Sequence, residues 1–226
     1  DHAPLNGDFN IVPRAGNAMN EEIGGTLAFS QSAGTIKESM GIAVLQKFTG
    51  GAVAVNFVPK VGQKAEVADT AVNATTGKSG YEVSYFGQPV SGLDLFVNYA
   101  SATKDGAQVK DLKTQGAGFA YSVGSLKFGA EKVNMEDAAG TEKDTLEYGV
   151  VFKMSDNATV GIGHTTTEGK LVGGADAAAK EKINYLQVGY NLGAIGTQLS
   201  YIDADNLSYV AASDSKALVL KVNTKF

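Results

Sequence analysis

Residues 218–226 read Leu-Val-Leu-Lys-Val-Asn-Thr-Lys-Phe, and their side chains alternate between two kinds. One face of an extended chain here would carry Leu218, Leu220, Val222, Thr224 and Phe226. The opposite face would carry Val219, Lys221, Asn223 and Lys225. Successive side chains of a strand point to opposite faces, so this period of two predicts a β-strand with one apolar face.

The same alternation recurs in about eleven segments of the chain. They span residues 40–48, 51–58, 80–87, 93–99, 116–123, 125–133, 145–154, 160–165, 181–190, 195–204 and 218–226. The connections between these segments alternate between short and long along the chain. Short ones surround Gly50, Ser91, Gly124, Asp156 and Gly193, and long polar ones cover 59–79, 102–113, 134–143, 167–180 and 205–214. This order predicts an all-β, antiparallel, up-and-down transmembrane β-barrel with turns at one end and loops at the other.

Aromatic residues mark the strand ends next to the short connections. They are Phe48, Tyr85, Tyr121, Phe152, Tyr190 and Phe226, each in phase with the apolar face of its segment. We predict an aromatic girdle at one membrane interface, as in transmembrane barrels. The alternative is that they are ordinary core aromatics of a soluble sheet.

The polar face of the segments supplies the residues expected to line a channel. They are Glu82, Asp94, Lys127, Glu131, Glu147, Lys153, Lys221 and Lys225. Small neighbours such as Gly116, Gly118 and Ala120 would leave room for water rather than fill a core. The mixed signs predict a polar, transversely charged channel rather than a site for one ion type.

Composition excludes several classes of function. The formal net charge of −5, with no basic stripe to neutralise phosphates, argues against nucleic-acid binding. The chain has no cysteine, so neither a disulfide nor a thiolate metal site is possible. No stretch approaches the roughly 18 apolar residues of a membrane helix. His2 and His164 are the only histidines, and we expect no enzyme activity, cofactor or metal.

Several hairpins resemble those of the general porins of Gram-negative bacteria, which are trimeric barrels of sixteen strands. The resemblance rests on 41–44 with 48–51 and 55–59, on 81–99, and on the ending 189–226. It covers roughly residues 38–226, the C-terminal two-thirds of such a protein. It implies an integral outer-membrane homotrimer that contacts lipid and lipopolysaccharide. It also implies that the outer-membrane assembly machinery reads Phe226.

The direction of each strand, counted back from the C-terminus, adds a further expectation from the resemblance. If Phe226 ends in the periplasm, counting back places the start of residues 40–48 outside the cell. We therefore expect the first five strands of the family barrel to precede this chain, with 40–226 as the barrel domain. Residues 1–39 would then be the pore-constriction loop, with Asp8, Glu21, Glu22 and the possible counter-charge Arg14. The alternative is that 23–31 is a further strand of a twelve-stranded barrel.

The sequence thus leads to three functional hypotheses. The first is a porin, a passive diffusion channel for ions and small hydrophilic solutes. The second is a substrate-selective outer-membrane channel. The third is a non-channel β-rich surface or ligand-binding protein.

Overall fold

The computed structural model describes residues 42–59, 77–104, 111–136, 141–170, 177, 179–207 and 210–224. These residues form a single antiparallel sheet of eleven strands, in which every strand pairs with its neighbours in sequence. The strands are β1 (Ile42–Phe48), β2 (Gly51–Val58), β3 (Gly77–Val90), β4 (Leu93–Lys104), β5 (Leu112–Val123), β6 (Leu126–Glu136), β7 (Glu142–Lys153), β8 (Ala158–Lys170), β9 (Glu181–Leu192), β10 (Ile195–Asp205) and β11 (Ser215–Thr224). The predicted up-and-down strand order is confirmed. Residues 1–39, including the alternative strand 23–31, lie outside the described residues.

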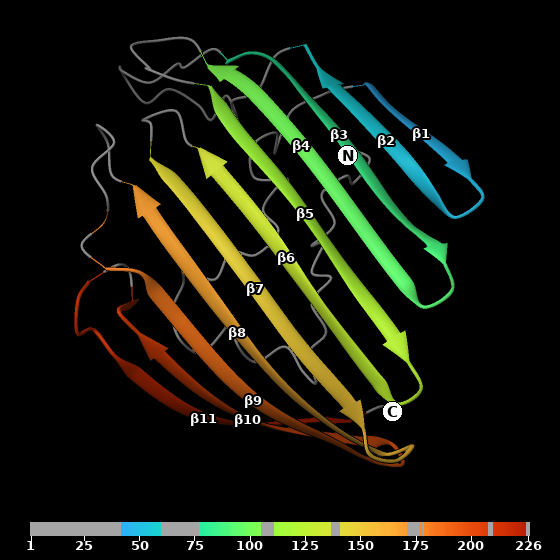
Figure 1. Ribbon diagram of the computed structural model, residues 1–226, viewed down its shortest axis with the longest axis vertical. Coiled ribbons are helices and arrows are strands. Elements are labelled where there is room, and N and C mark those ends of the chain that lie inside the picture. Colours follow the sequence, from blue (N-terminus) through green and yellow to red (C-terminus); the bar gives the residue numbers. More distant parts are fainter. Residues whose placement is uncertain are drawn as a thin grey trace.

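The five short connections lie at one end of the sheet (Figure 1). Four of them contain a glycine with positive φ, which a side chain would disfavour. The fifth, between β7 and β8, is closed by hydrogen bonds instead. The Met154 amide donates to the Ala158 carbonyl at 2.9 Å, and the Ser155 hydroxyl accepts from the Ala158 amide at 3.1 Å. Each of the five hairpins that these connections close is therefore held in register by its own turn.

The sheet curls from β1 to β11 and has two chemically distinct faces (Figure 1). We call the face that carries Ser200 and Ile202, both buried, the inner face. The opposite, outer face carries large apolar side chains that are exposed, such as Leu199 and Tyr201. Apolar side chains that point away from the buried face are expected in a sheet whose outer surface meets lipid.

The apolar band on the outer face approaches the height of the lipid-facing band of a transmembrane barrel. On β7 it runs from Leu146 through Tyr148 and Val150 to Phe152, all 37–50% exposed. Met154 continues the band after the strand. Eight residues rise about 27 Å along a strand, or about 20 Å across a membrane when the strand is tilted by about 40°. Transmembrane barrels have a band of about 25 Å.

The inner face also holds a small apolar cluster. Ile183 and Tyr185 of β9 pack there with Ile202 and Ala204 of β10. In the described part of the chain β1 pairs only with β2, and β11 only with β10, so the sheet has two open edges. Among the described residues no helix is long and apolar enough to cross a membrane.

Candidate pore wall

Most of the polar residues that the sequence assigns to a channel lining share the inner face. The strand registers place there Glu82, Asp94, Lys127, Glu131, Glu147, Lys153 and Lys221. Lys225 lies outside the described residues, as do Asp8, Arg14, Glu21 and Glu22. That these groups line a pore stays a prediction.

The lining charges that the sequence predicts lie at two depths on the inner face. Lys127 follows the β5–β6 turn, and Lys153 ends β7 at the next turn. Lys221 pairs in register with Gln198, three residues from the start of β10. Asp94 lies at the same end, where its carboxylate meets the Lys127 ammonium at 3.4 Å. The glutamates instead lie nearer the middle of their strands, and Glu131 is directly opposite Glu147.

Burial also differs between the negatively charged glutamates and the positively charged lysines of the inner face. Glu82, Glu131 and Glu147 are 1%, 3% and 0% exposed. The side chains of Lys127 and Lys153 are 43% and 54% exposed. The lysines at the short-turn end are therefore reached by solvent, whereas these glutamates are enclosed. Alternation along a strand indicates which face a residue occupies, but not what covers it.

Glu82 belongs to a hydrogen-bonded polar cluster on β3 and β4. The Asn98 side-chain amide donates to Glu82 Oε1 at 2.9 Å and to the Ser84 hydroxyl oxygen at 2.7 Å. The Ser84 hydroxyl donates to Glu82 Oε1 at 3.4 Å. All three residues are buried, so these bonds offset part of the cost of removing the Glu82 carboxyl group from water. Sequence reasoning did not single out Asn98, although the alternation over 93–99 places it on the same face as Asp94.

Glu147 of β7 accepts a hydrogen bond from a tyrosine on β9, two strands away in the sheet. The Tyr185 hydroxyl of β9 donates to Glu147 Oε1 at 3.3 Å. Its ring crosses β8 at Gly163, where a Cβ atom would overlap the ring. The missing side chain of Gly163 thus lets Tyr185 reach β7. The sequence contains no local signal for this contact, because the three residues are far apart along the chain.

The β7–β8 turn carries an exposed ion pair at the same end as the lysines. The Lys153 ammonium contacts the Asp156 carboxylate at 2.8 Å. This hydrogen bond lowers the pKa of the Asp156 carboxyl below its ordinary value. Lys153 therefore has its closest carboxylate in the turn rather than on a neighbouring strand.

The predicted girdle residues that the structure describes lie on the outer face near the short turns. The rings of Phe48 and Tyr85 stack with centroids 6.2 Å apart, and those of Tyr121 and Phe128 meet edge to face at 5.8 Å. Phe152 and Tyr190 are exposed on the same face. Phe226 lies outside the described residues. Their role as a membrane girdle remains a prediction.

His164 lies on the outer face, with both ring nitrogens hydrogen-bonded. Nδ1 is 2.7 Å from the Asn184 amide oxygen, and Nε2 is 2.8 Å from the Thr166 hydroxyl. Its ring packs on that of Tyr148 at 5.3 Å. Within the described ranges no group of three or more His, Cys, Asp or Glu side chains is arranged to hold a metal ion.

Comparison with solved structures identifies porin barrels of the same fold. OmpF of Salmonella typhi superimposes with a TM-score of 0.60 at 13% identity, over 81% of this chain and 61% of that one. A refined porin gives a TM-score of 0.60 at 16% identity, over 82% and 61%. OmpT of Vibrio cholerae, an outer-membrane protein, gives 0.54 at 14%, over 82% and 64%.

The chain therefore has the fold of an outer-membrane porin barrel wall, and it spans about three fifths of the length of these structures. The resemblance inferred from the sequence is confirmed at the level of the fold. No protein-family model matches the chain, and no curated protein matches it.

Proposed function

We propose that the chain forms part of the wall of an outer-membrane channel of a Gram-negative bacterium. The observation that carries this proposal is the division of one curled sheet into two faces. Large apolar side chains are exposed on the outer face, whereas lysines, glutamates and amides occupy the inner one. Such a wall separates lipid from a polar interior.

We further propose passive diffusion of ions and small hydrophilic solutes as the transport mode. The inner face carries charges of both signs, and the exposed lysines lie close to carboxylates of Asp94 and Asp156. A wall of this kind attracts neither anions nor cations strongly enough to trap them, and weak binding favours conduction.

The test is single-channel conductance of the full-length folded protein in a planar bilayer. Stepwise, solute-independent conductance is the expected result, together with heat-modifiable migration on a gel. Block of the current by one solute at low concentration would favour a substrate-selective channel instead. A folded preparation that yields no conductance would overturn the channel and favour a non-channel β-rich surface or ligand-binding protein.

Partners form a separate part of the proposal. One neighbouring structure is a trimer form of OmpT from Vibrio cholerae, which supports a homotrimer here as well.

We also propose that residues 1–39 constrict the pore through Asp8, Glu21, Glu22 and Arg14. Phe226 would be read by the assembly machinery. Native mass spectrometry tests the trimer, and deletion of Phe226 tests assembly through the yield of folded protein in the membrane.

A further inference from the structure

The buried carboxyl group of Glu82 on the inner face has hydrogen bonds but no ion pair. Its Oε1 accepts from the Asn98 amide at 2.9 Å and from the Ser84 hydroxyl at 3.4 Å, and both donors are neutral. None of the ion pairs within the described ranges involves Glu82. A carboxylate that is 1% exposed has lost most of its contact with water, and neutral donors replace only part of that solvation. This position therefore favours an incoming positive charge.

Asn98 adds a hydrogen-bond acceptor to the same place. Its side-chain oxygen Oδ1 is buried and accepts no hydrogen bond from any described residue. The amide nitrogen of this side chain lies 2.9 Å from Glu82 Oε1, so its oxygen is close to the carboxyl group as well. A buried acceptor without a donor is costly, and a ligand that donates a hydrogen bond to it therefore gains affinity.

The inner face continues from this polar cluster to two aromatic residues. Phe86 follows Ser84 by two positions on β3 and lies directly opposite Phe96 on β4. Phe86 is 49% exposed, so solvent reaches the inner face about 7 Å along the strand from Ser84. A solute that approaches here would place its hydrocarbon part against the rings and its polar end against Glu82.

We propose that the cluster of Glu82 and Asn98 binds the primary ammonium group of a small solute that crosses the channel. An ammonium group carries a positive charge and three N–H donors, and it has no acceptor. Two N–H groups would donate to the Glu82 carboxylate and to Asn98 Oδ1. The third would donate to the amide oxygen of Asn56, which lies directly opposite Glu82 on β2 and is 8% exposed. The inference rests on the proposed function, because it treats the inner face as the wall of an aqueous channel.

Other classes of ligand match the cluster less well. A hydroxyl group supplies a donor but no charge, and a quaternary ammonium group supplies a charge but no donor. A calcium ion takes about six to eight oxygen ligands, usually with several carboxylates among them, whereas Glu82 is the one carboxylate of this cluster. Within the described ranges no group of three or more His, Cys, Asp or Glu side chains is arranged for a metal ion.

The first experiment measures the binding of two small cations to the full-length folded protein in detergent by saturation-transfer NMR. The probes are ethanolammonium chloride and choline chloride, whose cations share a charge and a hydroxyl group but differ in N–H donors. We expect ethanolammonium to bind at least about tenfold more tightly, because choline has no N–H to donate to Glu82 or Asn98. Equal affinities would overturn the proposal, since charge alone would then account for binding.

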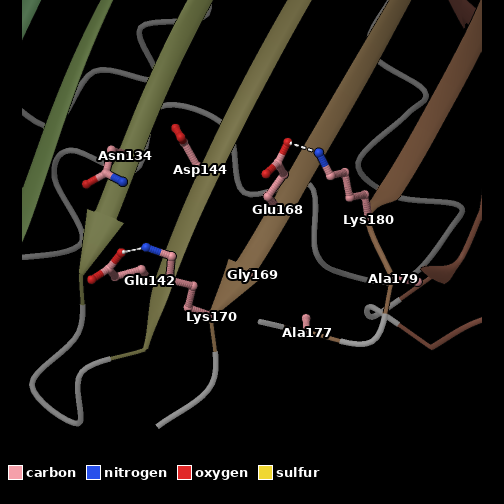
Figure 2. A pocket seen from close by; sticks show the side chains of 9 residues that line it. All are labelled: Asn134, Glu142, Asp144, Glu168, Gly169, Lys170, Ala177, Ala179 and Lys180. Atoms are coloured by element: carbon pink, nitrogen blue, oxygen red, sulfur yellow. Dashed lines mark hydrogen bonds and ion pairs between the residues drawn. The ribbon is translucent and has the colours of Figure 1, made fainter. Parts of the chain in front are cut away.

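The variant E82Q removes the charge of the site and keeps an oxygen for the hydrogen bonds from Asn98 and Ser84. It should weaken the binding of ethanolammonium at least about tenfold. The matched control E168Q removes a carboxylate from the outer face, where Figure 2 shows Glu168 against Lys180 in a hollow at the loop end of β6–β8. It should bind both probes as the wild-type protein does. Unchanged binding by E82Q, or an equal loss in E168Q, would overturn the proposal. If E82Q folds poorly, the comparison of the two probes on the wild-type protein decides alone.

Single-channel conductance of the same proteins separates this inference from the proposed function. A wild-type protein that conducts but binds ethanolammonium and choline equally keeps the channel and removes the ammonium site. A protein that binds ethanolammonium through Glu82 but does not conduct keeps the site and removes the channel.

Discussion

At Gly163 the inner face of β8 has no side chain, and the ring of Tyr185 occupies the space. We predict that G163A destabilises the fold by about 1–3 kcal/mol, because the ring must rotate away from Glu147. Urea unfolding of the refolded protein measures the loss. The matched control is G196A on β10, where a Cβ would meet the flexible Asn191 side chain at 3.3 Å and the Asn223 carbonyl oxygen at an ordinary 4.0 Å. Equal losses in both variants would contradict the role of Tyr185.

Asn98 provides a second prediction at the residue scale. N98A removes the amide that donates to both Glu82 and Ser84, and leaves a buried carboxylate short of a donor. We expect a loss of about 1–3 kcal/mol in the free energy of unfolding. Adding E82Q to N98A should recover part of this loss, since a neutral amide costs less to bury than a charge. The exposed inner-face residue Asn223 gives the control N223A, for which we expect almost no change.

At the scale of the strand, the alternation of faces can be tested on two neighbouring residues. Val150 lies on the outer face of β7, and Val151 lies on the inner face opposite Lys127. V150E places a carboxylate against lipid, and we expect it to destabilise the inserted sheet by about 1–2 kcal/mol. V151E places the same group beside an exposed ammonium and should be tolerated. Folding into lipid vesicles across a urea series distinguishes the two, and equal costs would contradict the assignment of faces.

Strands were also the part of the structure that could be predicted most fully from the sequence. Their existence, order and faces follow from local alternation, as in 218–224, and the short turns follow from residues such as Gly50. The burial of Glu147 and the contact of Tyr185 with it do not follow. Both depend on residues brought together across strands, and a pattern of period two contains no information about such distances.

For the molecule as a whole, the position of three lysines at one end of the inner face has a consequence for conduction. Lys127, Lys153 and Lys221 occupy the short-turn end of the inner face, two of them against Asp94 and Asp156. The triple variant K127Q/K153Q/K221Q would leave these two carboxylates without their ammonium partners. We predict that the permeability ratio of K⁺ to Cl⁻ rises about twofold or more, because the mouth of the channel then concentrates cations.

The measurement is the zero-current potential of single channels in a KCl gradient. The control K216Q removes a lysine of the same kind from the outer face, so it lowers the net charge without altering the channel mouth. A shift in the triple variant alone means that the local field of the inner face sets selectivity. A comparable shift in K216Q would mean that the overall charge of the protein does so. No shift in either would mean that these lysines lie away from the ion path, which would remove them from the proposed pore lining.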